Sequence, residues 1–313
     1  MAESYTTLSL GFKTDINDKL SVGLFVNQPY GADAKYTAGF YNGLEAHWSS
    51  EQIAALIKYD VGSGVSVYGG AKYVTSEAQI AIPDRMIRAS MLAAGGSAAA
   101  LAGAAPAGTL GYTATTDKNS QAALIVGAAY EKPEIALRVA LTYASETKHD
   151  LATSVGGSPV GSETVELPKS VTLDAQSGIA ANTLLFGSVR WVDWTSTTLN
   201  SIGYPFAPLV SHDNDTITYT LGVGRKFTDN WSGAVSVGYE KPAGGLASNL
   251  APTDGFLSLG VGGSYTQGNM KISGGVRYVK IGDADALEDH DVAQGAFRDN
   301  SAVGVGVKVG WTF

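Results

Sequence analysis

Hydrophobic and polar side chains alternate along most of this chain, and the alternation is clearest at its carboxyl end. In the segment VGVKVGWTF (Val305 to Phe313) every odd-numbered residue is valine or aromatic, whereas Gly306, Lys308 and Gly310 take even positions. Successive side chains of a strand point to opposite faces, so this pattern predicts a strand with one apolar and one polar face.

The same alternation recurs along the chain, and in its clearest segments the ionisable residues fall on one parity only. Because no helical segment is expected to cover so many apolar faces, we predict an all-β, antiparallel transmembrane barrel. Thirteen strands are expected at about residues 4–13, 18–29, 51–60, 64–78, 119–131, 134–148, 164–178, 182–196, 214–227, 230–241, 254–267, 270–281 and 298–313. They form a single domain over residues 1–313.

Composition agrees with this class. The mean hydropathy is +0.04, and no apolar run approaches the roughly 18 residues of a membrane-spanning helix. The chain has 39 glycines, 15 tyrosines and 16% charged residues, as suits a curved sheet with small lumenal side chains and aromatic girdles. It has no cysteine and a formal net charge of −8. This charge, with no basic stripe or zinc spacing, argues against nucleic acid as a partner.

The connections between the predicted strands are alternately short and long. The short ones cover residues 14–17, 61–63, 132–133, 179–181, 228–229 and 268–269, and the long ones 30–50, 79–118, 149–163, 197–213, 242–253 and 282–297. Outer-membrane barrels have short periplasmic turns and long extracellular loops. We therefore expect a bacterial outer-membrane location with the carboxyl terminus in the periplasm and residues 79–118 as a long extracellular loop.

Thirteen strands conflict with the even number that is usual in bacterial outer-membrane barrels. We expect that a first strand lies upstream, because the sequence opens on MAES without the basic region, apolar segment or cleavage site of a secretory signal. The alternative is that one strand has been split or merged in this interpretation.

Several segments resemble the FadL-type family of outer-membrane long-chain fatty-acid and hydrophobic-compound transporters. They are INDKLSVGLFVNQPYGADAKY (residues 16–36), GVSVYGGAKYVTSEAQI (64–80), VELPKSVTLDAQSGIAANTLLFGSVRWVDWT (165–195), FTDNWSGAVSVGYEKPA (227–243) and the terminal WTF, in the family's order. The resemblance implies a 14-stranded barrel and passive uptake of hydrophobic molecules. The family's hatch, with its Asn-Pro-Ala motif, and the first strand have no counterpart in this sequence.

The 79–118 loop is the candidate for capture of substrate. Pro83 can occupy the first turn of a helix, and the alanine-rich segment that follows carries flexible apolar side chains. We expect Met86, Ile87, Met91, Leu92 and Leu101 to form an exposed apolar surface. The alternative is that this segment packs over the mouth of the barrel or is disordered.

The second candidate site is a lateral opening in the wall. Pro29 has no N–H for a strand ladder, so it belongs at a bulge, an edge or a strand end. The resembling family releases substrate sideways at a kink in the corresponding strand, which here implies the segment Asn27, Gln28, Pro29, Tyr30 and Gly31. The alternative is a strand that simply ends in a turn.

Cationic side chains on the polar parity are expected inside the barrel. Any of them can pair with a fatty carboxylate or with a lumenal acid such as Glu240; they are Lys58, Lys72, Arg138, Arg190, Lys271, Arg277 and Lys308, of which we single out Arg138, Arg190 and Arg277. The aromatic residues Tyr73, Tyr143, Trp191, Trp194, Tyr239 and Tyr278 are expected in an interfacial girdle.

No catalytic constellation is evident, and neither an enzyme nor a cofactor is expected. The four histidines lie in or beside predicted loops, and no serine has a nucleophile-elbow context. An acidic run, Asp283, Asp285, Glu288, Asp289 and Asp291 with His290, is interpreted as a solvated charge run or a site for a cation that bridges lipopolysaccharide. The expected partners are a hydrophobic solute and outer-membrane lipid and lipopolysaccharide around a monomeric barrel; a general porin or structural barrel is the competing function.

Overall fold

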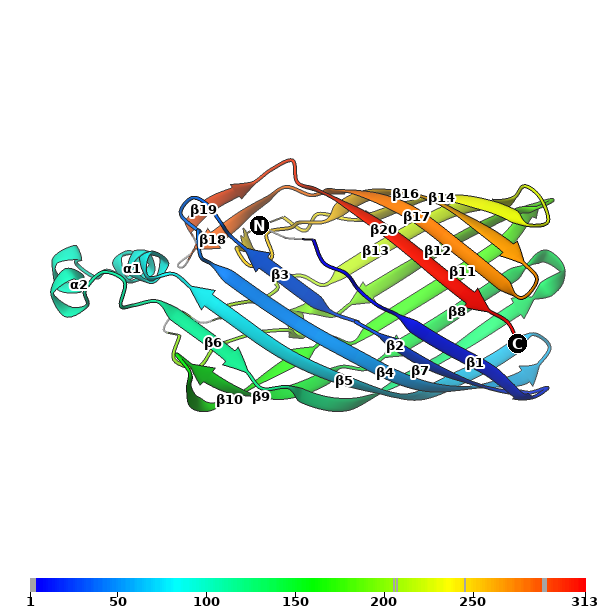
Figure 1. Cartoon of the computed structure of the whole chain (residues 1–313), viewed down its shortest axis with the longest axis horizontal. Coiled ribbons are helices and arrows are strands. Elements are labelled where there is room, and N and C mark those ends of the chain that lie inside the picture. Colours follow the sequence, from blue (N-terminus) through cyan, green and yellow to red (C-terminus); the bar gives the residue numbers. More distant parts are fainter. Residues whose placement is uncertain (1–3, 205, 207, 245, 289–291) are drawn as a thin grey trace.

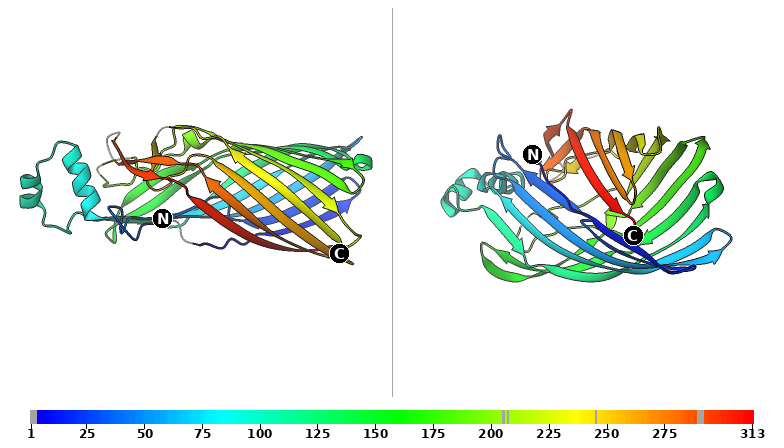
Figure 2. Two further views of the ribbon diagram at one scale, coloured as in Figure 1. Left: turned by 90° about the horizontal axis from the view of Figure 1, so that it is seen from above. Right: turned by 45° about the vertical axis from the view of Figure 1, so that its right-hand side comes forward.

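The structure, a computed structural model, describes residues 4–204, 206, 208–244, 246–288 and 292–313. One antiparallel sheet curves around a lumen (Figures 1 and 2). Each of the thirteen predicted segments overlaps one strand of this wall, so the predicted fold is confirmed. In order around the wall the strands are β1 (Leu10–Asn17), β2 (Leu20–Asn27), β4 (Glu45–Gly62), β5 (Val65–Ile82), β7 (Asn119–Lys132), β8 (Leu137–Ala144), β11 (Ser170–Ala180), β12 (Thr183–Val192), β13 (Thr216–Lys226), β14 (Trp231–Glu240), β16 (Phe256–Gln267), β17 (Met270–Ile281) and β20 (Ser301–Trp311).

The sheet is not closed, because β1 and β20 form its two edges and no pairing joins them among the described residues. Both strands run toward the end of the barrel where the short turns lie, the short-turn end (Figure 1). Two parallel edges cannot pair with each other in an all-antiparallel wall. The thirteen strands predicted from the sequence therefore leave the wall open between β1 and β20.

The first strand is displaced from its predicted position. It was expected at residues 4–13 with a turn at 14–17, whereas β1 ends at Asn17 and the turn follows it. The Asn17 side chain accepts hydrogen bonds from the backbone N–H groups of Lys19 and Leu20 at 2.9 and 3.0 Å. The Asn17 side chain thus binds the free backbone N–H groups of the turn. This turn fixes where β1 ends, although the apolar alternation begins further upstream, around residues 4–10.

Four further strands prolong the wall at the other end, the long-loop end. They are β3 (Gly31–Lys35), β6 (Tyr112–Thr116), β9 (Thr147–Val155) and β10 (Ser158–Leu167), and they lie largely in segments predicted as loops. That part of the prediction is wrong. The outward positions of β9 and β10 include Lys148, Asp150, Thr164 and Glu166, so these strands lack the apolar outer face from which strands were predicted. Three short strands, β15 (Leu246–Ser248), β18 (Ala284–Glu288) and β19 (Val292–Phe297), form a separate sheet.

Two helices, α1 (Asp84–Ala93) and α2 (Ala98–Ala104), project beyond the long-loop end (Figures 1 and 2). Two single turns of 3₁₀-helix, η1 (Pro133–Ile135) and η2 (Trp194–Ser196), follow β7 and β12. None of the described helices has the length and apolar character needed to cross a membrane.

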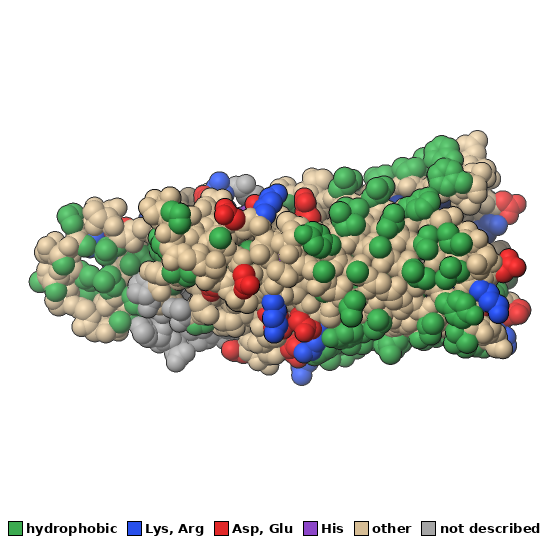
Figure 3. Space-filling view, turned by 90° about the horizontal axis from the view of Figure 1, so that it is seen from below, with side chains coloured by type: hydrophobic (Ala, Val, Ile, Leu, Met, Phe, Trp, Pro, Cys, Tyr) green, Lys and Arg blue, Asp and Glu red, His purple; other side chains and the backbone are tan. Residues whose placement is uncertain are grey.

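An exposed apolar belt surrounds the half of the barrel next to the short-turn end. Hydrophobic side chains gather there, and charged ones lie at its two borders (Figure 3). On β20 the odd-numbered valines from Val303 to Val309 are 59 to 75% exposed, whereas Lys308 has the opposite parity and lies in register with Ser273 and Ser264, which line a cavity inside the barrel. This arrangement is the apolar-out, polar-in pattern of a barrel wall in lipid.

Aromatic side chains border the belt on both sides. One girdle lies toward the long-loop end and contains Tyr73, Tyr143, Trp191, Tyr219, Tyr239 and Tyr278; the other lies toward the short-turn end and contains Tyr59, Tyr130, Phe227, Trp231, Tyr265 and Trp311. The expected girdle residues take these places with the exception of Trp194. That prediction is wrong, because Trp194 packs against Tyr30 and His212.

Candidate functional site

A cluster of buried apolar side chains, here called the mouth cluster, fills the long-loop end of the barrel. Strands β3, β5 and β6, helix α1 and the loops contribute to it. Its buried members are Ala34, Tyr36, Leu44, Ile80, Ile82, Met86, Ile87, Tyr112, Ala114 and Leu250. Partly buried side chains, among them Met91, Tyr204, Phe206 and Phe297, pack against it. An apolar solute that reaches this end therefore meets apolar side chains from several parts of the chain.

Helix α1 supplies the residues predicted for capture, but two of them are not exposed. Met86 and Ile87 are only 6% and 4% exposed within the mouth cluster, so the prediction of an exposed surface is wrong for both. Met91 is half-buried at the edge of the cluster, Leu92 is 43% exposed, and Leu101 on α2 is half-buried. Amphipathic α1 turns one side toward the cluster, and an alanine-rich sequence gave little indication of which side that would be.

An ion pair fixes the start of α1. Asp84 binds Arg88 through two hydrogen bonds of 2.7 and 3.2 Å and accepts a third, of 2.7 Å, from the backbone N–H of Leu110. The Arg88 guanidinium, with the Leu110 N–H, lowers the pKa of Asp84 to about 2. Both residues thus hold the segment after α2 against the helix that carries the capture residues.

The wall is interrupted at the predicted lateral opening. Strands β2 and β3 both pair with β4, through Asn27 opposite Gln52 and Gly31 opposite Ser49. Three residues, Gln28 to Tyr30, therefore face only two on β4. This is a bulge with one extra residue, and it contains Pro29, which has no N–H to donate.

A serine side chain replaces the missing ladder bonds at this bulge. The Ser50 hydroxyl accepts a hydrogen bond from the Tyr30 N–H at 3.0 Å and donates one to the Tyr30 carbonyl at 2.5 Å. The backbone of Tyr30 is consequently held away from β4 by the length of a serine side chain. The Tyr30 hydroxyl donates to the Pro168 carbonyl at 3.0 Å, and its ring meets Trp194 edge-on at 5.6 Å.

The three lumenal arginines singled out from the sequence have different surroundings. Arg138 pairs with Glu131 at 3.3 Å, and Lys58 binds the same carboxylate at 3.2 Å. Arg277 donates to the Ser258 hydroxyl at 3.0 Å. Arg190 lies beside the Tyr30 side chain. The structure therefore does not bring the three together, and only Arg190 is near the wall interruption.

A cavity of about 1100 Å³ lies inside the barrel near the short-turn end. Its wall from β13 to β20 is nearly free of side chains, because Gly224, Ala234, Gly262, Gly275 and Gly306 are consecutive neighbours in register. The next row toward the short-turn end consists of Lys226, Ser232, Ser264, Ser273 and Lys308.

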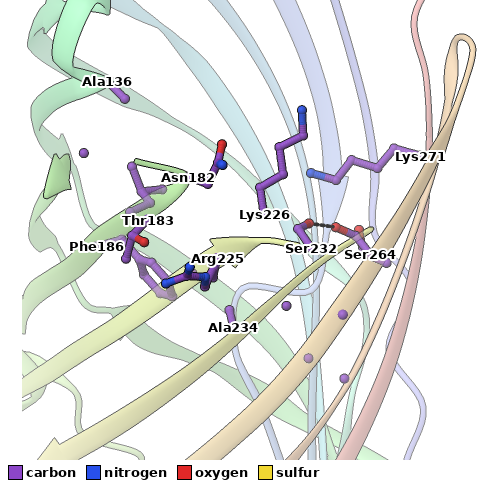
Figure 4. A pocket seen from close by; sticks show the side chains of 18 of the residues that line it. Ala136, Asn182, Thr183, Phe186, Arg225, Lys226, Ser232, Ala234, Ser264 and Lys271 are labelled. Carbon is purple, nitrogen blue, oxygen red and sulfur yellow. Dashed lines mark hydrogen bonds between the residues drawn. The ribbon is translucent and has the colours of Figure 1, made fainter. Parts of the chain in front are cut away.

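Figure 4 shows the Lys271 side chain extending toward that of Lys226 beside the Ser232 and Ser264 hydroxyls, which are 2.7 Å apart. The Lys226 ammonium pairs with Asp229 at 2.9 Å. The floor of the cavity therefore carries a patch of ammonium and hydroxyl groups within a lining of mainly glycine and apolar side chains. Sequence parity predicted that Lys271 and Lys308 face the lumen, but not that five neighbouring strands present one continuous smooth wall.

One carboxyl group at the long-loop end lacks a complete set of partners. Glu163 on β10 faces the lumen beside the 197–213 loop, and its Oε1 is buried without a hydrogen-bond partner among the described residues. Burial raises the pKa of Glu163 to about 7, against the opposing effect of the Asn200 backbone. The sequence gave no signal for this group, because the residues that bury it are distant in the chain.

We expect the packing of the 197–213 loop on β10 to weaken as pH rises. A carboxyl whose folded pKa is raised favours folding while it is neutral, so this contribution is present below the unfolded value of 4.5 and is lost as pH rises through about 7. The protection factors of the Asn200 to Ile202 amides, which are exchange rates corrected for base-catalysed intrinsic exchange, should fall between pH 5 and 8, roughly the span of these two values. Glu163→Gln should abolish this dependence.

Glu166→Gln is the matched control, because Glu166 lies on the opposite face of the same strand and pairs with Lys148 at 3.2 Å. A pH dependence that persisted in Glu163→Gln, or disappeared in Glu166→Gln, would contradict the assignment.

The structure describes only part of the acidic run at residues 283–291. Asp285 pairs with Arg298, and Asp283 accepts a hydrogen bond from the Asp299 N–H at 3.0 Å. Asp289, His290 and Asp291 lie outside the described residues. Across the described ranges no group of three or more metal-ligating side chains is present.

Comparison with known proteins identifies the family. The family model for outer membrane protein transport proteins (OMPP1/FadL/TodX) matches residues 8–313. The chain belongs to this family. It is a family of outer-membrane transporters and not of enzymes, and the family resemblance inferred from the sequence is confirmed.

Solved structures share the fold at low sequence identity. A Pseudomonas aeruginosa FadL homologue matches with a TM-score of 0.74 and 15% identity, over 96% of this chain and 76% of the other. The Pseudomonas putida toluene transporter TodX matches with a TM-score of 0.63 and 13% identity, over 99% and 83%. The Ralstonia pickettii toluene transporter TbuX matches with 0.61 and 13%, over 97% and 81%. A search of curated proteins returned no match.

Proposed function

We propose that this protein is a passive channel for hydrophobic molecules, which bind at the mouth cluster and leave sideways through the interruption at residues 27–31. The carboxyl terminus then lies in the periplasm with the short turns, and the mouth cluster faces the exterior. The observation that carries the proposal is the bulge between β2 and β3, which breaks the wall ladder directly below an apolar mouth. Long-chain fatty acids and monoaromatic hydrocarbons, the latter named for solved relatives, are the candidate solutes.

The cationic groups on the floor of the lower cavity support release sideways and not straight through. Below the interruption the lumen leads to the cavity whose floor carries Lys226, Lys271 and Lys308. Moving an acyl chain from the mouth cluster past these ammonium groups into water at the short-turn end costs roughly 0.8 kcal/mol per methylene, whereas passage through the wall transfers it to lipid. The same cavity would suit a porin, so ionic conductance separates the two functions: a porin conducts steadily, and a closed channel for apolar solutes conducts little.

A further strand is needed to complete the wall. Because β1 and β20 run in the same direction, one strand antiparallel to both closes the barrel with fourteen strands. We propose that such a strand, with any hatch, completes the transporter, which acts as a monomer surrounded by lipid and lipopolysaccharide.

Capture is tested at the accessible residues of α1. Leu92→Gln and Met91→Gln should each weaken binding of a lipophilic fluorescent probe by up to about tenfold, because a leucine or methionine contact with an apolar solute is worth on the order of 1.5 kcal/mol. Equilibrium titration in detergent measures this directly.

Met86→Gln serves to separate capture from packing. Met86 is buried, so placing an amide there without a hydrogen-bond partner should lower the free energy of unfolding by about 1 to 3 kcal/mol as well as weaken binding. Arg85→Gln is the matched control on the exposed side of α1. If the Leu92→Gln, Met91→Gln and Arg85→Gln variants bound the probe equally well, the mouth cluster would have a structural role and would not bind solute.

A further inference from the structure

Two interruptions of the wall that lie far apart along the sheet meet inside the lumen. The first is the bulge at residues 28–30 between β2 and β3, and the second is the break at residues 168–169 between β10 and β11. Tyr30 joins them through its 3.0 Å hydrogen bond to the Pro168 carbonyl. Five steps around the wall, over β4, β5, β7 and β8, separate β2 from β11.

For this contact to form, the backbone at residues 28–30 and at residues 168–169 must lie inside the lumen and not in the wall. Neighbouring strands are about 4.8 Å apart, so five steps are far beyond the reach of one side chain. The bulge is displaced inward by the Ser50 hydroxyl, which takes the place of β4 backbone groups in binding Tyr30. The lumen is therefore crossed at the level of the proposed lateral opening.

The far side of the crossing is held firmly. Lys169 pairs with Asp193 at 2.7 Å, and the Asp193 N–H donates to the Lys169 carbonyl at 3.2 Å. These bonds tie the break at 168–169 to η2, where Trp194 meets the Tyr30 ring. The Thr195 N–H and hydroxyl donate to Asp215 at 3.1 and 2.9 Å. Tyr30 thus rests against a cross-linked unit, whereas its own segment lacks regular ladder bonds.

We propose that Tyr30 closes the passage: its bridge to Pro168 and Trp194 blocks water and ions in the lumen below the mouth cluster. Solutes that do not displace the bridge stay above it, next to the wall interruption. The mobile partner is the bulge, since its two backbone bonds go to a single side chain. The inference rests on the proposed function, because it assigns a role at the lateral opening.

The absence of cysteine from the sequence permits a direct test. A single cysteine at Ser264, in the floor of the lower cavity, reports access from the long-loop side when a bulky, charged thiol reagent is added to protein in vesicles. We expect slow labelling with Tyr30 present and labelling at least tenfold faster with Tyr30→Ala. Tyr30→Phe keeps the ring contact with Trp194 and loses the bond to Pro168, so it should fall between them. Ionic conductance should rise in the same order.

Phe186→Ala is the matched control, since Phe186 is a lumenal aromatic residue that lines the lower cavity and not the crossing. Its labelling rate and conductance should equal those of the parent. Thermal unfolding is measured for each variant, because a purely structural role of Tyr30 would lower stability without faster labelling. Labelling of Tyr30→Ala at the parent rate would overturn the proposal.

The two proposals fail separately. If deletion of Pro29, which removes the extra residue of the bulge, left uptake unchanged while Tyr30→Ala sped up labelling, lateral release would be contradicted and the bridge would be supported. If instead the deletion reduced uptake while Tyr30→Ala was labelled at the parent rate, the bridge would be contradicted and lateral release would be supported.

Discussion

Deleting Pro29 is expected to abolish most uptake of lipophilic solutes while leaving their binding at the mouth cluster intact. Three residues between Asn27 and Gly31 face two on β4, so removal of one restores equal numbers and a continuous ladder. With the wall closed, the solute must pass through the lower cavity and enter water at the short-turn end. For a chain of about ten methylenes that route costs on the order of 8 kcal/mol, which is enough to reduce uptake to the background rate.

Uptake of a fluorescent long-chain fatty acid and of a neutral aromatic dye into vesicles measures the effect and compares the two candidate classes of solute. Pro29→Val is the informative partner variant. It restores an N–H but keeps the extra residue, so it should slow uptake less than the deletion does. Probe binding in detergent checks that the mouth cluster is unaffected. Unchanged uptake by the deletion variant would contradict lateral release and favour a porin or structural barrel.

The interruption itself was predictable, and its closure by Tyr30 was not. Proline cannot donate to a ladder, so the position of Pro29 in a regular alternating segment already predicted a bulge or strand end there. The bond from Tyr30 to Pro168 joins residues 138 apart in sequence. It depends on two wall interruptions facing each other across the lumen, and no local pattern encodes that distance.

The same division applies to the rest of the fold. Strands inside the apolar belt were predicted because lipid imposes one apolar face on every strand. Strands β9 and β10 extend beyond the belt, where nothing requires an apolar outer face, and the predicted loop at 149–163 was wrong for that reason. Met86 and Ile87 have the composition expected of a capture surface, but their burial is set by loops that converge from distant parts of the chain.

Val307→Arg is expected to destabilise the barrel in lipid by roughly 2 to 4 kcal/mol, the cost of a cation near the bilayer midplane. Val307 is 75% exposed on the outer face of β20 and lies midway between Val303 and Trp311, and it pairs with Gly274. Arginine there cannot reach either border of the belt as easily as at the strand ends. Reversible unfolding from vesicles measures the change.

Lys308→Arg is the matched control, because the adjacent residue faces the lumenal cavity and the substitution keeps a cation in water. It should change the free energy of unfolding by less than about 0.5 kcal/mol, as substitutions away from special structural features usually do. A one-residue shift of β20 would exchange the two faces of the strand. If Val307→Arg were tolerated and a charge at position 308 were costly, the assignment of the lipid-facing side of β20, and of every strand in register with it, would be wrong.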